Sequence, residues 1–261
     1  MSDKINYADA LGFHSIAGAV VFSILYVPLF ARFLRQSFQR PTYVFIVLTL
    51  FCSIRIAAFV IRAVLAGSES AGETLSLFIA DQVLFGVGFF GLLYSGYTLV
   101  LDRELLTRDG SSQNFFNRIT GNRRLFRVVM MAAVILGIVG SSQADSSDPT
   151  KGTTLRKVST IIFLVLTTLL AYRTIVLART ELSSGYRHAD GSIGGDYGAY
   201  VLCVIAGLLL VREVFATATM GSLEKQNNER LWYPLSALPE IVAVTLYAAP
   251  GLVPPRSELP T

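Results

Sequence analysis

The chain contains little charge and few of the residues that build metal or redox centres. Charged residues make up 15% of its 261 residues, whereas hydrophobic residues make up 52%. This balance excludes a soluble domain with an ordinary charged surface. Only two cysteines and two histidines occur, and their positions show no metal-ligand spacing. We therefore expect neither a metal site nor a cofactor.

Several catalytic motifs are missing as well. The sequence has no HExxH, no GxSxG and no phosphate-binding P-loop. It also lacks the adjacent aspartates that bind magnesium beside a prenyl diphosphate. The last apolar segment has no lysine, so a retinal Schiff base is not supported. Any catalysis would therefore rest on acid–base or electrostatic effects.

Long apolar segments dominate what is present. The mean hydropathy is +0.55, and seven stretches approach or exceed the roughly 20 residues that a spanning helix needs. They cover about 11–34, 42–66, 75–101, 125–141, 154–178, 197–219 and 230–251. The predicted fold class is all-α: a polytopic, multi-pass membrane protein in which residues 1–261 form one integral membrane domain, a bundle of seven transmembrane helices.

Basic residues concentrate in the loops after the first, third and fifth predicted spans. They are Arg32, Arg35, Arg40, Arg103, Arg108, Arg118, Arg123, Arg124, Arg127, Arg179 and Arg187. Because Lys and Arg in short loops favour the cytosolic side, we predict the amino terminus outside and the carboxyl terminus in the cytosol. Only Lys151, Arg156 and Lys157 oppose this orientation, because they lie in the fourth connection, which is predicted to be outside. The same rule accounts for the net charge of +4, so we expect no nucleic-acid partner; either the plasma membrane or the endoplasmic reticulum fits this topology.

Six ionisable residues lie inside the predicted spans, where a central charge costs at least ~2.5–3.5 kcal/mol. They are Arg55, Arg62, Asp81, Arg212, Glu213 and Glu240. The predicted topology places all six at mid-depth or in the outer half, on spans two, three, six and seven. Three arginines can balance three carboxylates. We therefore predict a polar cavity between these four spans that opens to the outside.

The polar residues of this region supply the candidate site. The residues expected to bind a substrate are Arg55, Arg62, Gln82, Arg212, Glu213, Trp232 and Tyr233. If the protein is an enzyme, Asp81 and Glu240 are the catalytic candidates, because a carboxyl group in a low-dielectric cavity can act as a general acid. The alternative is purely structural, since a buried pair such as Arg62 with Asp81 can hold helices together. Arg173, in the fifth span, is expected to reach the cytosolic headgroups.

The carboxyl-terminal third is similar to a known family. The run VREVFATATMGSLEKQNNERLWYPLSALPE resembles the fungal RTA1-like family, seven-span proteins described as lipid-translocating or toxicant-resistance proteins. The positions that match the family pattern are Arg212, Phe215, Glu229, Tyr233 and Pro239, and those that depart from it are Ala216, Thr219 and Ser236. The resemblance implies a seven-span fold and a role with lipids.

Three functions remain open. The first is binding or translocation of a lipid or amphiphile through the outer-half cavity, with membrane lipids or a lipophilic small molecule as the partner. The second is an intramembrane acid–base enzyme, such as a terpene cyclase or isomerase acting on a lipophilic substrate. The third is a seven-span receptor, which the short loops support least. The sequence indicates no protein partner.

Overall fold

The computed structural model describes residues 12–107, 122–143, 149–184 and 192–254. Within these ranges the chain forms helices and turns and contains no strand. Six of the described helices are long and apolar enough to cross a membrane. They are α2 (Ile16–Gln39), α3 (Tyr43–Gly67), α5 (Leu75–Thr107), α7 (Arg123–Ser142), α8 (Pro149–Ser184) and α10 (Gly198–Thr219). The architecture is therefore all-α and of the multi-pass membrane type.

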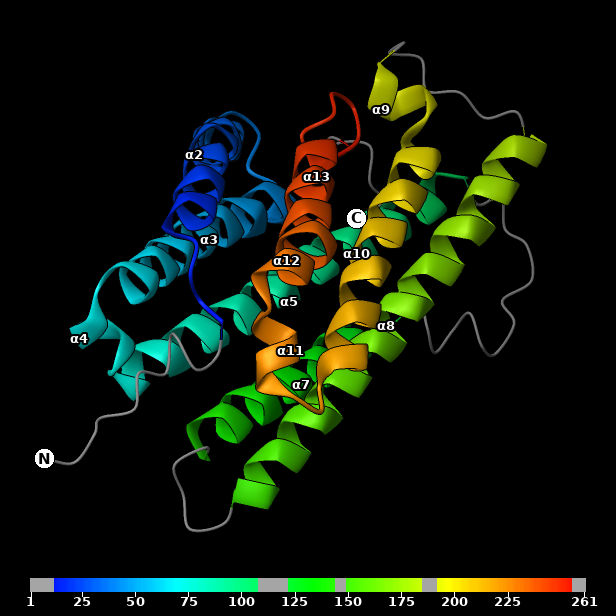
Figure 1. The fold of residues 1–261 in the computed structure, drawn as a ribbon. Coiled ribbons are helices and arrows are strands. Elements are labelled where there is room, and N and C mark those ends of the chain that lie inside the picture. The colour runs from blue at the N-terminus through cyan, green and yellow to red at the C-terminus, as the bar shows by residue number, and fades with distance from the viewer. Residues whose placement is uncertain (1–11, 108–121, 144–148, 185–191, 255–261) are drawn as a thin grey trace, which may run out of the picture.

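The helices pack in a ring that follows the order of the chain (Figure 1). α2 packs against α3, α3 against α5, α5 against α7, α7 against α8, and α8 against α10. The ring closes through α13 (Leu238–Tyr247), which contacts both α10 and α2. α5 also contacts α8 and α10 across the ring. Polar side chains on α5 can therefore meet partners from several helices.

The seventh predicted span is helical but divided. α12 (Glu229–Trp232) leads into a π-helical turn, η2 (Tyr233–Ala237), which continues as α13. Pro234 and Pro239 lie near the starts of η2 and α13, and each lacks the N–H that a regular helix uses. Because of this division, the segment is not among the six long helices. A seventh crossing stays a prediction.

Several helices extend beyond the predicted apolar stretches, most clearly α5 and α8. Apolar length marks only the part of a helix that suits hydrocarbon, whereas helical hydrogen bonding continues into polar sequence. Two ion pairs join α5 to α8 at or next to these extensions: Arg103 Nε lies 3.0 Å from Glu181 Oε1 in a buried pair, and Arg173 Nη2 lies 2.8 Å from Glu104 Oε2 in a partly buried one. Arg173 is therefore buried against α5, and the prediction that it reaches the headgroups is wrong.

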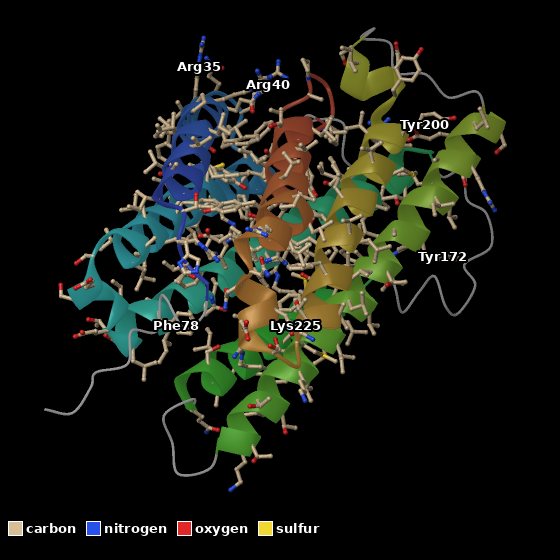
Figure 2. All side chains as sticks on the ribbon, in the orientation of Figure 1. Arg35, Arg40, Phe78, Tyr172, Tyr200 and Lys225 are labelled. Atoms are coloured by element: carbon tan, nitrogen blue, oxygen red, sulfur yellow. The ribbon has the colours of Figure 1, made fainter. Side chains whose placement is uncertain are left out.

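The two ends of the bundle are distinguished by their short helices. α11 (Leu223–Asn227) lies at one end, and α9 (Ile193–Asp196) lies at the other (Figure 1); we call these the α11 end and the α9 end. Arg35 and Arg40 lie at the α9 end, away from Lys225 (Figure 2). The predicted topology makes the α9 end cytosolic. Both termini lie outside the described residues, as do three of the predicted cytosolic arginines, Arg108, Arg118 and Arg187.

Candidate functional site

A connected network of polar side chains joins four helices inside the bundle. Glu240 on α13 pairs through both carboxylate oxygens with Arg55 on α3, and Arg55 Nη2 donates to Oε2 at 2.7 Å. The Tyr26 hydroxyl of α2 donates to Oε1 at 3.2 Å, and Arg212 Nε of α10 lies 3.1 Å from Oε2. Arg212 also donates to Glu213 through Nη1. Two arginines therefore balance two glutamates here.

Arg55 reaches this position by lying against the backbone of α5. Its Nη1 donates to the carbonyl of Leu84 and its Nη2 to the carbonyl of Phe85, both at 3.0 Å. A Cβ added at Gly88 would lie 2.7 Å from Nη1, so this close approach requires a glycine. Every nitrogen of the fully buried guanidinium has a partner, which is the condition under which a protein interior tolerates a charge.

Arg62, two turns further along α3, is buried in a different environment. It is 1% exposed, and none of its three guanidinium nitrogens has a hydrogen-bond partner among the described residues. Aromatic rings surround it: its Cζ lies 3.7 Å from the ring centroid of Trp232, 4.3 Å from that of Phe13 and 5.5 Å from that of Phe85. Cation–π attraction compensates part of the desolvation but leaves the N–H donors unused.

Asp81 on α5 lies near Arg62 and interacts with it electrostatically. Its Oδ1 has no hydrogen-bond partner in the described part of the chain, while Oδ2 accepts from Gln82 Nε2 at 3.2 Å. Gln82 Nε2 also donates to Asn227 Oδ1 at 3.2 Å. The pair of Arg62 with Asp81, considered above as a purely structural contact, is therefore not formed as a direct hydrogen-bonded ion pair.

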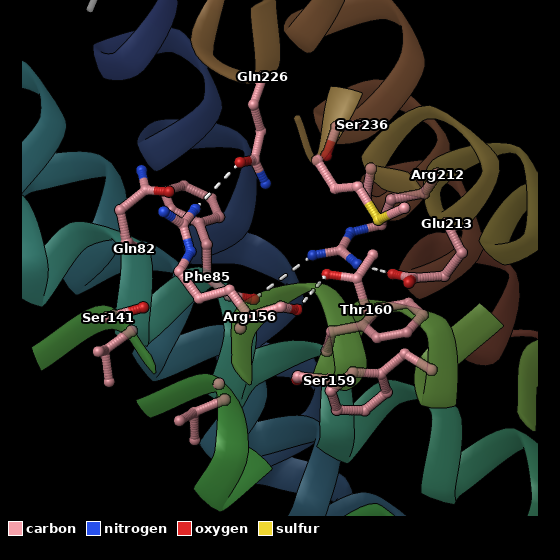
Figure 3. Close-up of a pocket in the computed structure, with 18 of the residues that line it drawn as sticks. Gln82, Phe85, Ser141, Arg156, Ser159, Thr160, Arg212, Glu213, Gln226 and Ser236 are labelled. Atoms are coloured by element: carbon pink, nitrogen blue, oxygen red, sulfur yellow. Dashed lines mark hydrogen bonds and ion pairs between the residues drawn. The ribbon is translucent and has the colours of Figure 1, made fainter. Parts of the chain in front are cut away.

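A cavity of about 150 Å³ lies beside the network, between α5, α7, α8, α10 and η2 and next to α11 (Figure 3). A cavity of about 150 Å³ can hold a group about as large as benzene. It therefore accommodates a small polar group but not an entire lipid.

The cavity lining combines polar and apolar side chains. The polar and charged lining residues include Arg62, Gln82, Arg156, Arg212, Glu213, Gln226 and Ser236. The apolar ones include Val83, Val87, Val134, Ile138, Phe163 and Phe215. Gly86 on α5 and Ile138 on the neighbouring α7 both line the cavity and are exposed on the surface, and a Cβ added at Gly86 meets nothing within 4 Å. The cavity therefore reaches the surface of the bundle between α5 and α7.

The predicted site residues fall into two groups. Those that line the cavity are Arg62, Gln82, Arg212, Glu213 and Trp232. Arg55 is enclosed between Glu240 and α5, and Tyr233 stacks on Phe22 of α2 with ring centroids 5.3 Å apart, so neither lines it. Asp81 and Glu240 do not line it either. The structure thus connects four of the six predicted charges in one network, while only three of the six border the cavity.

Helices α7 and α8 contribute lining residues that the sequence did not predict. Arg156 of α8 extends along the cavity, and its Nη2 donates to Gln226 Oε1 at 3.1 Å (Figure 3). It had been counted as a loop residue that opposes the predicted topology. Small residues were the available signal, because they let two helices approach closely: a Cβ added at Gly140 of α7 would lie 2.8 Å from the carbonyl oxygen of Gly152 on α8.

The lining is rich in hydrogen-bond donors and positive charge. Three arginines face one glutamate, and Glu213 is already paired with Arg212. Guanidinium groups present several N–H donors in a planar fork that matches carboxylate and phosphate oxygens. Within the described residues, no group of three or more His, Cys, Asp or Glu side chains is arranged to hold a metal ion. The arrangement is therefore suited to binding a hydrogen-bond acceptor.

Comparison with known proteins identifies one family. Residues 6–253 match a family described as "Domain of unknown function (DUF7702)", which covers nearly the whole chain. No curated protein and no solved structure matches the chain.

Proposed function

The chain belongs to the DUF7702 family, and we propose that it binds, and moves within the membrane, a lipid or other amphiphile held by its polar end. The observation that carries the proposal is the composition of the cavity. Guanidinium donors of Arg62 and Arg156 and apolar side chains of α5 and α7 line the same space. Ligand sites are typically apolar pockets with a few polar groups that fix the orientation of the ligand.

The size and opening of the cavity support an amphiphile rather than a wholly enclosed solute. The cavity volume of about 150 Å³ fits a small group and not a whole lipid. Its opening beside Gly86 and Ile138 lies on the side of apolar helices, where a hydrocarbon tail can continue into the bilayer. A ligand with a polar end inside and an apolar tail outside satisfies both features.

An acid–base enzyme is less well supported by the same geometry. Glu240 already accepts from Tyr26 and Arg55 and pairs with Arg212, and neither it nor Asp81 lines the cavity. A general acid must lie within hydrogen-bond reach of the atom that it protonates. Binding therefore ranks above catalysis.

The proposal also includes the finer membrane topology. We propose that α12, η2 and α13 together form a seventh crossing, with the α11 end outside and the α9 end in the cytosol. Arg35 and Arg40 lie at the α9 end, and the rule that arginine and lysine favour the cytosolic side supports this orientation. Under this topology the cavity lies toward the outer leaflet, in agreement with the lipid role implied by the resemblance to the RTA1-like family.

The single tryptophan of the chain gives a direct test. Trp232 lines the cavity, so its fluorescence reports on what enters. We would titrate purified protein in neutral micelles with single-chain amphiphiles that carry bromine, a contact quencher, on the chain carbon next to the head group, and whose head is anionic, zwitterionic or cationic. At least one of these amphiphiles is expected to quench the fluorescence of Trp232 saturably. The concentration needed should be far below that at which the amphiphile partitions non-specifically into the micelles.

A matched pair of variants separates the cavity from the lipid-facing surface. Gly86→Leu adds a side chain at the opening of the cavity, whereas Gly207→Leu adds the same side chain on the exposed face of α10; an added Cβ meets nothing within 4 Å at either position. We expect saturable quenching to be lost in Gly86→Leu and retained in Gly207→Leu. Equal quenching in both variants, or none in the wild type with any head group, would contradict the proposed function.

A further inference from the structure

We infer that the polar end of the ligand is an anion, such as a phosphate or carboxylate, that Arg62 and Arg156 hold from the α3 and α8 sides of the cavity. This inference rests on the proposed function and names the chemical class of the head group. The inference rests on a comparison of the arginines in this region: the hydrogen-bond donors of some are already engaged, and those of others are not.

Arg156 is the arginine of the cavity that lacks a charged partner. It is half-buried, and the hydrogen bond of its guanidinium is to the neutral amide of Gln226, at 3.1 Å. Among the described residues, no carboxylate pairs with it or interacts with it electrostatically. A cation held away from water without a counter-charge favours an anion that can enter beside it.

Arg62 supplies the second set of unused donors. Its side chain borders the cavity and is 1% exposed, yet Nε, Nη1 and Nη2 have no hydrogen-bond partner in the described part of the chain. The rings of Trp232, Phe13 and Phe85 hold the guanidinium in place without engaging its donors in the plane. Buried donors of this kind are almost always satisfied. Because the three nitrogens have almost no accessible surface in the structure, the guanidinium must turn toward the cavity for an acceptor-rich group there to satisfy them.

The other two arginines of the region are already engaged. Arg55 uses its donors on Glu240 and on two carbonyl groups of α5, and Arg212 lies between Glu213 and Glu240. Of the charged residues that line the cavity, Arg212 is therefore already paired with Glu213, whereas Arg62 and Arg156 are available. Phosphate and carboxylate oxygens match the guanidinium fork, whereas an ammonium head would find no unpaired carboxylate among these lining residues.

Head-group preference tests the inference. The titration of Trp232 uses one brominated acyl chain joined to a phosphate, a phosphocholine or a primary amine, and a further arm uses glycerol phosphate, which has no chain, as a competitor. We expect the phosphate-headed lipid to bind at least about tenfold more tightly than the amine, because charge-assisted hydrogen bonds form only with the anion.

Two variants test which arginines cause the preference for the phosphate head group. Arg156→Gln is expected to weaken binding of the phosphate-headed lipid by about tenfold and to leave binding of the amine unchanged. Arg179→Gln, an exposed arginine on the same helix, is the matched control and should bind like the wild type. Arg62→Met replaces the second guanidinium with an apolar side chain and is expected to lose the preference; its melting temperature is measured alongside, because Asp81 loses the arginine with which it interacts. If Arg62→Met does not fold, Arg156→Gln alone decides.

The outcomes separate the two proposals. Equal affinity for all three head groups, or the same affinity in Arg156→Gln and Arg179→Gln, overturns the anionic head group and leaves amphiphile binding standing. Absence of saturable binding by every lipid in the wild type overturns both. If glycerol phosphate competes as strongly as the lipid with the same head, the anion is supported as the recognised chemistry, but its source is a soluble molecule and the amphiphile is overturned.

Discussion

Replacing Glu240 with glutamine should destabilise the protein strongly. Glu240 is 2% exposed and is shared by Arg55, Arg212 and Tyr26. In Glu240→Gln, one carboxylate oxygen becomes an NH₂ group. Each of the two oxygens faces an arginine donor, so in either orientation the NH₂ group of the glutamine faces another donor. The substitution also removes the only carboxylate among the described residues that bonds directly to Arg55.

The expected size follows from the burial of this network. Removing one partner of a buried ion pair costs about 3–5 kcal/mol, because the other charge is left uncompensated. For a chain of this length, 1 kcal/mol shifts the melting temperature by about 2–4 °C, so Glu240→Gln should lower it by roughly 6–20 °C. The double variant Arg55→Met with Glu240→Met removes both charges and should recover much of the loss.

The assay is thermal unfolding in neutral micelles, followed by the fluorescence of Trp232. Glu224→Gln, at an exposed position of α11, provides the control and should shift the melting temperature by less than 2 °C, because exposed substitutions change stability by about 0.5 kcal/mol or less. If Glu240→Gln melts within 2 °C of the wild type, Glu240 does not link α3 to α10 as described.

Three further perturbations test other parts of the structure. Gly88→Ala should reduce stability, because the added Cβ lies 2.7 Å from the pinned guanidinium of Arg55, whereas Gly86→Ala should raise it by about 0.5–1 kcal/mol through helix propensity; thermal unfolding compares the two, and equal shifts would contradict the placement of Arg55. Arg103→Gln should cost about 3–5 kcal/mol in the same assay by removing the arginine that forms an ion pair with the buried carboxylate of Glu181, and an unchanged melting temperature would show that the pair does not hold α5 to α8. Ser70→Cys, exposed in the short helix α4 (Glu69–Gly72) that follows α3, should resist a thiol reagent that does not cross membranes when the reagent is applied to the cytosolic face of sealed membrane vesicles, and labelling from that face would reverse the proposed orientation.

The sequence predicted the long helices well, because apolar length and hydrocarbon thickness are tied directly. Six of the seven predicted spans are uninterrupted helices of the required length and composition. The seventh is divided by η2, and Pro234 and Pro239 were the visible reason. The ends of α5 and α8 could not be predicted from apolar length, because buried pairs such as Arg103 with Glu181 continue these helices past the apolar sequence.

The candidate site was only partly predictable. Depth along a span follows from counting residues, and it correctly brought Arg55, Arg212 and Glu240 to a common level. The direction in which each side chain points around its helix depends on tertiary packing, which counting does not give. For that reason the sequence could not show that Arg62 and Arg55 have different surroundings, although both guanidinium groups lie near the ring of Phe85. Arg156 was assigned to a loop for the same reason, since only the close approach of α7 and α8 turns it into the bundle.

Native mass spectrometry of the protein purified from its membrane in a mild detergent tests the central proposal most directly. We expect the wild type and Gly207→Leu to retain a lipophilic molecule with an anionic group, and Gly86→Leu, whose added side chain obstructs the opening of the cavity, to have lost it. Retention of the same molecule to the same extent by all three proteins would contradict a ligand site in this cavity.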